Sequence, residues 1–301
     1  MKKKSKKSSG EVSQRTLVQQ SWLQFRHNRT AMIGLAILIV LLLIVVATVG
    51  IDFATNKEIY NNYVKKQELA NKLLLPCAEH PFGCDEFGRD MLLRILWGTK
   101  YSLVIGILAV IFSLLVGGPL GTIAGYYGGK IDNVIMRLMD VLLACPFILL
   151  AMAIVTALGT SIPNLLIALG ISGLAGYARI ARAAVMSVKD QEFIEAARAM
   201  GANNFTIITK YIIPNAMAPI LVQFTLGVGS SILNVAGLSY IGLGVQPPTP
   251  EWGSMLTAAK VYMMDAWHIS VIPGLFLVIA VIAVNLFGDG LRDALDPKMK
   301  R

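Results

Sequence analysis

The sequence contains little charge. Asp, Glu, Lys and Arg make up 15% of its 301 residues, whereas soluble domains carry about 25%. Only 3 histidines and 3 cysteines are present. The histidines (His27, His80 and His268) stand near the ends of apolar stretches or outside them, so they do not converge on an enzyme centre. No Gly-x-x-x-x-Gly-Lys-Ser/Thr phosphate loop occurs, so we expect neither ATP hydrolysis by the chain itself nor a bound cofactor.

Apolar residues are abundant instead, at 55% of the chain. Several uncharged stretches are long enough to cross a bilayer, which takes about 20 residues. One stretch, Val141–Ala178, is too long for a single helix and is interrupted at Gly159–Asn164, a turn signal. The predicted spans are Ala31–Gly50, 102–124, two helices within Val141–Ala178, 217–241 and Ala266–Gly288. We therefore predict an all-α polytopic membrane protein with six transmembrane helices.

The basic residues predict the orientation of these spans. With both termini in the cytoplasm, 19 of the 27 lysines and arginines lie on the cytoplasmic side, as the positive-inside rule requires. The net charge of +9 therefore reflects topology, and we expect no nucleic-acid partner. The lysine-rich start, Lys2–Lys7, is expected to contact anionic membrane lipid.

No predicted span carries a charge near its middle, which argues against a proton-coupled carrier. Polar uncharged residues do occur within the spans, and four are candidates for a translocation pathway: Gln223, Ser230, Asn234 and Asn285. The alternative is that each one forms hydrogen bonds between packed helices. No repeated pore motif that would indicate an ion channel is visible.

A charged segment separates two of the apolar stretches. Within it, Phe193, Ala196, Ala197 and Met200 recur at helical spacing and predict one apolar face. Gly201 can adopt the left-handed conformation that ends a helix. A following short helix could be capped by Asn203 or Asn204 and limited by Pro214. Spacing alone is equally compatible with an ordinary amphipathic loop on the membrane surface.

The order Glu195-Ala196-Ala197, three residues, Gly201, and then Pro214 thirteen residues later resembles the EAA loop of ABC-importer permeases. Tyr211 and Ile213 replace the Ile and Leu usual in that family, and both keep the segment apolar.

Further motifs resemble the C-type subunit of dipeptide and oligopeptide ABC importers, so that the likeness covers nearly the whole chain. They are Trp22–Gly34, His80–Asp90, Gln246–Gly253 and Gly288–Pro297.

The resemblance implies the type I ABC importer permease fold in the cytoplasmic membrane. Residues 1–95 would form the tail, first helix and outer segment, and residues 96–301 a five-helix core with a cytoplasmic coupling loop at 183–215. Such a subunit pairs with a related second permease, two ATP-binding subunits and an extracytoplasmic peptide-binding protein. The coupling residues would be Glu195, Ala196, Ala197, Gly201 and Pro214. The cargo would be di- or oligopeptides, or alternatively a nickel chelate, glutathione or another small solute.

Two cysteines lie in the predicted outer segment, where oxidation is possible. Related permeases more often have small hydroxyl residues at Cys77 and Cys84, and this paired departure suggests a disulfide between them. Two free thiols are the alternative. A metal site formed with His80 is not predicted, because zinc ligands usually come in tighter pairs.

Overall fold

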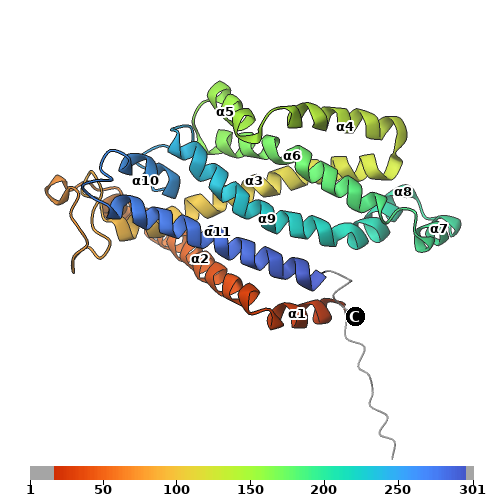
Figure 1. The fold of residues 1–301 in the computed structure, drawn as a ribbon, viewed down its shortest axis with the longest axis horizontal. Coiled ribbons are helices and arrows are strands. Elements are labelled where there is room, and N and C mark those ends of the chain that lie inside the picture. The colour runs from red at the N-terminus through yellow and green to blue at the C-terminus, as the bar shows by residue number, and fades with distance from the viewer. Residues whose placement is uncertain (1–16, 296–301) are drawn as a thin grey trace, which may run out of the picture.

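The computed structural model describes residues 17–295, and these residues form helices without a regular strand (Figure 1). The basic tail Lys2–Lys7 and the last two residues of the C-terminal motif, 296–297, lie outside this range. In chain order the helices are α1 (Leu17–His27), α2 (Arg29–Ala54), η1 (Tyr60–Val64), η2 (Leu69–Asn71), α3 (Met91–Tyr127), α4 (Gly129–Ala144), α5 (Phe147–Leu158), α6 (Ile162–Met186), α7 (Glu192–Ala199), α8 (Asn204–Thr206), η3 (Ile207–Ile212), α9 (Ile213–Tyr240), α10 (Trp252–Ala259) and α11 (His268–Leu295).

Five helical stretches within residues 17–295 are long and apolar enough to cross a membrane: α2, α3, α6, the continuous run from α8 to α9, and α11. The pair α4–α5 adds a sixth if its two arms count as one span. The prediction of an all-α polytopic membrane protein is therefore confirmed.

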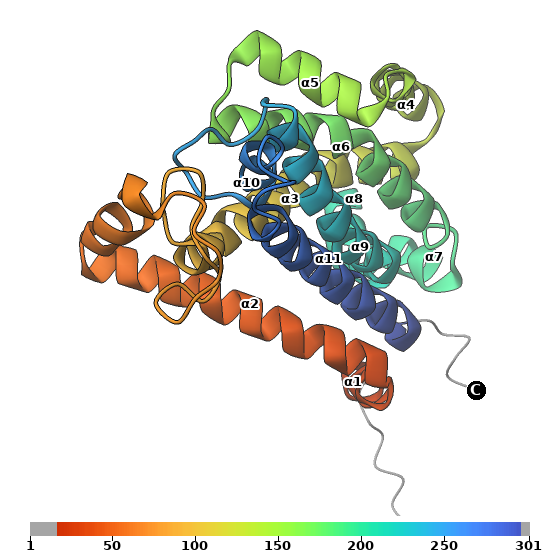
Figure 2. The ribbon, with the colours of Figure 1, turned by 60° about the vertical axis from the view of Figure 1, so that its left-hand side comes forward.

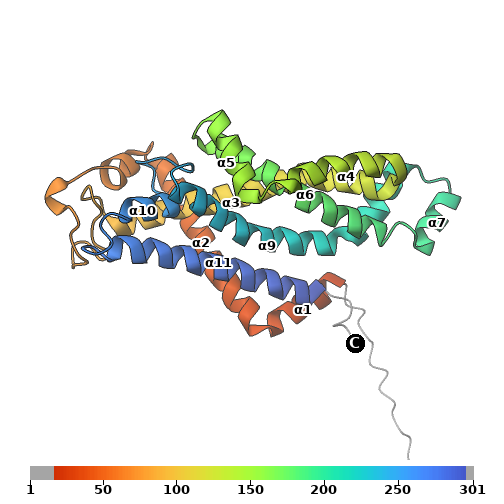
Figure 3. The ribbon, with the colours of Figure 1, turned by 45° about the horizontal axis from the view of Figure 1, so that its top comes forward.

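The predicted span that begins at Val141 is not a single straight helix. Its arms α4 and α5 meet at 87° (Figure 3). Pro146 causes the break, because a proline disfavours helical backbone in the residue before it. Cys145 accordingly adopts an extended conformation, with φ −93° and ψ 132°.

Helices α3 and α6 form the tightest helix pair, because small residues let their backbones meet. A Cβ atom added at Gly117 would lie 2.4 Å from the Leu174 carbonyl oxygen, and one at Gly121 would lie 2.0 Å from that of Ala178. Any larger side chain at either glycine would force the two helices apart.

The remaining helices surround this pair. Figure 2 shows α2 on one flank of the central helices, with α4 and α5 on the other. In Figure 1, α1, the end of α11 and α7 lie at one end of the molecule. Helix α10 and the segment 55–90 lie at the opposite end. The first described helix and the C-terminal end of the last one therefore lie at the same end of the molecule as the loop that contains α7.

Candidate functional site: the loop between α6 and α9 and a polar cavity

The loop 183–215 runs from the last turn of α6 through α7, α8 and η3 into α9. Acidic residues in the first turn of α7 and Arg198 in its last turn are the charges that the helix dipole favours at those ends. Gly201 ends the helix with φ +84°. Its amide donates to the Arg198 carbonyl, and the next amide, of Ala202, donates to the Ala197 carbonyl, a Schellman C-cap. The predicted left-handed glycine is confirmed.

The next turn is also as predicted. The side chain of Asn203 accepts a hydrogen bond from the Thr206 amide at 2.8 Å and thereby caps α8. Pro214 lies in the first turn of α9 and is exposed. The prediction that Pro214 limits the short helix is wrong, because the helical run continues from Asn204 through this proline to Tyr240.

The predicted apolar face of α7 is wrong in all but one residue. Ile194 and Ala197 are the buried residues, and Ile194 packs into a cluster with side chains of α6 and η3. Phe193, Ala196 and Met200 are exposed, and Met200 exposes 79% of its surface. Because α7 has only eight residues, its sequence offers two apolar stripes, and the neighbouring helices decide which one is covered.

Three contacts fasten this loop to the end of α3. The Tyr126 hydroxyl donates to the Asn204 side-chain oxygen at 2.7 Å. Lys189 donates through Nζ to the Gly125 carbonyl at 3.1 Å, and the Arg198 guanidinium lies 5.8 Å from the centre of the Tyr126 ring. A displacement of α7 would therefore reach α3 directly.

Most of the residues that the resemblance assigns to coupling are exposed on the loop. Glu195 and Ala196 are exposed on α7. Gly201 is also exposed, and no atom lies within 4 Å of where its Cβ would stand. Of the Glu-Ala-Ala triplet, only Ala197 is buried. The loop thus combines a buried anchor with an open surface.

A cavity of about 310 Å³ lies between α3, the α4–α5 bend, α6 and α9. Three of the four pathway candidates, Gln223, Ser230 and Asn234, line it. Asn285 does not line it: this residue is exposed on α11, next to Gly229. The lining contains no Asp, Glu, Lys or Arg, so hydrogen-bonding groups set among apolar side chains form its walls.

Tyr177 and Cys145 are among the lining residues that the sequence did not point to. Tyr177 contributes from α6, and its hydroxyl donates to the Gln223 carbonyl at 3.4 Å. Cys145 contributes from the α4–α5 bend. The Cys145-Pro146 dipeptide was the available signal, because the break that it causes turns that residue toward the cavity.

The suggested disulfide is absent: Cys77 and Cys84 are both free thiols. Cys77 is exposed, and its sulfur accepts from the His80 amide at 3.4 Å. Cys84 is fully buried, and its backbone pairs with Asp90. Burial raises the pKa of the Cys84 thiol to about 11. One thiol therefore faces solvent while the other is packed inside.

Comparison with known proteins agrees with this architecture. Residues 117–301 match the model of the binding-protein-dependent transport system inner membrane component. Residues 16–70 match that of the N-terminal TM domain of oligopeptide transport permease C.

Curated relatives match over nearly their full length. The dipeptide transport system permease protein DppC of Alkalihalophilus pseudofirmus is 43% identical, over 93% of this chain and 90% of the relative. The di/tripeptide permease DppC of Pseudomonas aeruginosa is 42% identical, over 94% and 93%. The glutathione permease GsiD of Escherichia coli is 46% identical, over 95% and 92%.

Among solved structures, the inward-facing MetNI methionine ABC transporter aligns with a TM-score of 0.58 and 20% identity, covering 68% of this chain and 98% of that one. This likeness supports the fold alone. The family matches and the curated relatives go further: the chain belongs to the binding-protein-dependent transport system inner membrane components and is an ABC importer permease of the oligopeptide permease C type.

Proposed function

We propose that this chain carries di- and oligopeptides across the cytoplasmic membrane as one of two related permeases, and that the loop 183–215 couples it to two ATP-binding subunits. The observation that carries the proposal is the division of α7. Ile194 and Ala197 anchor it, whereas Phe193 and Met200 remain open to a partner. An exposed apolar surface with a charged margin is typical of a protein docking site.

In this proposal the ATP-binding subunits close when they bind ATP and draw α7 with them. The contacts of Tyr126 and Arg198 pass the movement to α3, and the continuous run through η3 passes it to α9. Both helices line the polar cavity. ATP binding then favours one of two access states, which is a population shift driven by differential binding.

The cargo proposal rests on the relatives and on the cavity walls. Neutral donors and acceptors such as Gln223 and Asn234 suit the peptide bond, which every peptide shares whatever its side chains. The similarity to a glutathione permease favours glutathione, itself a small peptide, as the second candidate. An extracytoplasmic binding protein would deliver either cargo.

The proposed orientation places α7 in the cytoplasm. The ends of α1 and α11 lie at the same end of the molecule as α7, which supports a cytoplasmic location for both termini. The opposite end, with α10, would then receive the binding protein.

Cysteine cross-linking tests the coupling role. We would replace Cys77, Cys84 and Cys145 by serine, introduce Ala199→Cys, and express the variant with the candidate ATP-binding subunits. Ala199 is exposed on α7, so an adduct to an ATP-binding subunit is expected, with a yield that changes when ATP is added. Ala197→Cys is the matched control, because that position is buried and should form no adduct.

If Ala199→Cys forms no adduct in a complex that still transports, the coupling role is wrong. Uptake of labelled dialanine, in competition with unlabelled glutathione, then separates the two cargoes. Complete inhibition by a small excess of glutathione would favour the second candidate.

A further inference from the structure

Two ion pairs join α4 to α6 in the half of the molecule nearer to α7. Arg182 donates to both carboxylate oxygens of Asp132, at 2.6 and 2.5 Å. Arg179 donates from Nη2 to Asp140 Oδ1 at 2.6 Å. Because the later arginine meets the earlier aspartate, the two helices run antiparallel here. Each pair therefore marks a different depth along the same helix–helix contact.

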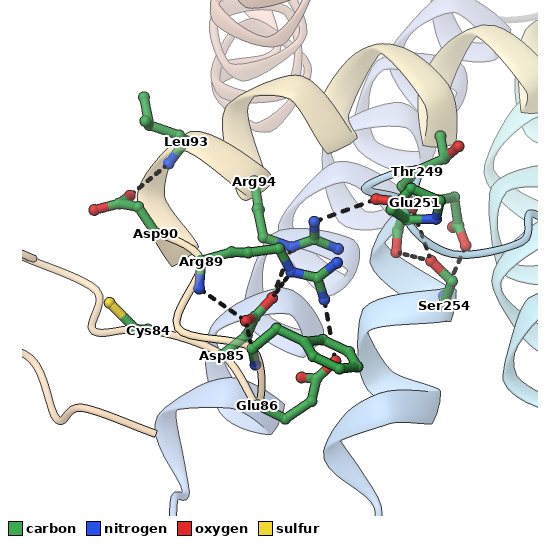
Figure 4. A network of polar contacts seen from close by, with 12 residues as sticks. Cys84, Asp85, Glu86, Arg89, Asp90, Leu93, Arg94, Thr249, Glu251 and Ser254 are labelled. Atoms are coloured by element: carbon green, nitrogen blue, oxygen red, sulfur yellow. Dashed lines mark hydrogen bonds and ion pairs between the residues drawn. The ribbon is translucent and has the colours of Figure 1, made fainter. Parts of the chain in front are cut away.

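The Asp140–Arg179 pair is open to its surroundings. These two side chains expose 47% and 54% of their surface. By contrast, the charged groups at the opposite end of the molecule are enclosed: Figure 4 shows Asp85 with Arg89 and Arg94, and Asp85 and Arg89 expose only 5% and 3% of their side chains. Contact between lipid and an exposed charged pair would be costly. The open pair therefore requires a polar neighbour that the enclosed pairs do not.

The open pair continues the polar cavity toward α7. Gly176 lines that cavity, and Arg179 follows it by three residues on the same face of α6. On α4, Asp140 stands two residues before Leu142, which also lines the cavity. No atom lies within 4 Å of where a Gly176 Cβ would stand. The described chain thus leaves the surface of α6 uncovered at Gly176, between the cavity and the pair.

The other side of α4 is apolar. Val134, Leu138 and Val141 recur at helical spacing and are all exposed, which is the pattern of a surface that meets lipid or a neighbouring apolar helix. Leu138 lies about 200° around the helix from Asp140, since each residue turns an α-helix by about 100°. Helix α4 therefore has a charged side and an apolar side that suit different surroundings.

We propose that the Asp140–Arg179 pair lines a water-filled exit, through which cargo leaves the cavity toward the end of the molecule that carries α7. Water rather than lipid meets the exposed part of the pair. Asp140 also neutralises Arg179, so that the guanidinium does not retain the carboxylate of a passing peptide. The inference rests on the proposed function, which supplies the cargo and the orientation.

Thiol labelling tests whether water reaches this surface. We would replace Cys77, Cys84 and Cys145 by serine, introduce Gly176→Cys, and assemble the variant with its partner subunits in inside-out membrane vesicles. The probe is a charged maleimide that does not cross membranes, applied with and without ATP. Leu138→Cys is the matched control on the apolar side of α4, and labelling after denaturation gives the total thiol.

In at least one of the two nucleotide conditions, Gly176→Cys should react at least about tenfold faster than Leu138→Cys, because hydrocarbon excludes a charged reagent. The added side chain should not disturb folding, since the space beside Gly176 is free. Equal rates in both conditions would overturn the proposal. Lipid or the second permease against this face would each give that result.

A pair of variants tests the role of Asp140. Asp140→Asn leaves Arg179 unpaired and should slow dialanine uptake at least about fivefold, because a free guanidinium forms charge-assisted hydrogen bonds with the cargo carboxylate. The double variant Asp140→Asn/Arg179→Gln removes that charge and should regain most of the uptake. If the pair served only to hold α4 against α6, the double variant would be as slow as the single one, and the proposed role would be wrong.

The labelling also separates this inference from the function on which it rests. Fast labelling of Gly176→Cys in a transporter that imports no peptide would support the exit and contradict the proposed cargo. Peptide import by a transporter in which Gly176→Cys is as unreactive as Leu138→Cys would leave the function standing and overturn the inference alone.

Discussion

Trp97 donates a hydrogen bond of 2.8 Å from its indole Nε1 to Asp52 Oδ1. The other oxygen of Asp52 pairs with Lys100. Asp52 lies in the last turns of α2 and both partners lie on α3. This polar contact therefore fastens α2 to α3 at the end of the molecule opposite α7.

Replacing the Asp52 carboxylate should loosen the attachment of α2 to α3. Asp52→Leu leaves Lys100 and Trp97 without their acceptor in a nearly buried position, and we expect a loss of about 3 kcal/mol in the free energy of unfolding. Denaturant titration of the purified chain in detergent measures it. Glu68→Gln, which breaks an exposed pair, should leave the titration unchanged. A variant as stable as the original chain would mean that apolar packing alone holds α2.

Substitution of Gly201 should uncouple transport from ATP hydrolysis. Gly201→Val strains a left-handed backbone, which costs a branched residue about 1–2 kcal/mol, and no neighbouring atom would obstruct the side chain. The expected result is normal membrane insertion with lost peptide uptake. Gly201→Asn is the control, because asparagine tolerates this conformation, and it should retain more uptake. Normal uptake by the valine variant would exclude a coupling role for the turn.

The two sides of α7 should respond differently to truncation. Ile194→Ala removes a fully buried side chain and should cost about 3 kcal/mol of stability. Met200→Ala removes an exposed one, so stability should change by less than about 0.5 kcal/mol while co-purification of the ATP-binding subunits falls. Thermal unfolding and pull-down measure the two effects. Intact partner binding by Met200→Ala would place the docking surface elsewhere.

The two outer cysteines should differ in reactivity, whether or not a reductant is present. With a pKa of about 11, about one Cys84 thiol in a thousand is ionised at pH 8, and the group is buried as well. Cys77 is exposed and should be alkylated first. Mass spectrometry after timed maleimide labelling follows both sites. If both thiols resist labelling until a reductant is added, the predicted disulfide between Cys77 and Cys84 is present after all.

Glu86 should make the protein less stable as the pH rises. Its pKa is raised from the ordinary 4.5 in the folded chain, so folding favours the protonated form. The stabilisation is fully present below pH 4.5 and is lost as the pH rises through the raised value. Glu86→Gln removes this loss.

The unfolding temperature of Glu86→Gln, relative to the original chain, should therefore increase from pH 4.5 upward. Glu79→Gln, at an exposed carboxyl of the same segment, should follow the original chain. Parallel curves for Glu86→Gln and the original chain would show that folding does not change the pKa of Glu86.

Features that depend on neighbouring residues could be predicted from the sequence. Gly201 ends α7, and Asn203 caps the next turn, because backbone conformation and capping act within a few residues. Pro146 carried an equally local signal, and attention to the residue before it would have predicted the break between α4 and α5.

Features that join distant segments could not be predicted. The exposed side of α7 depends on which neighbours cover Ile194, and the partners of Asp52 lie 45 and 48 residues away. Among the pathway candidates, Asn285 could not be separated from the other three, because only helix packing decides which polar groups face one cavity.

By itself the sequence determined that this chain is a helical membrane protein with a polar loop between two of its spans, since hydrophobic length and local backbone preference act along the chain. The tertiary structure alone decided that Arg94 meets Asp85 beside a loop 154 residues further on, that the two outer cysteines stay apart, and that α7 keeps Met200 exposed. Each of these depends on side chains that meet only after the helices have packed.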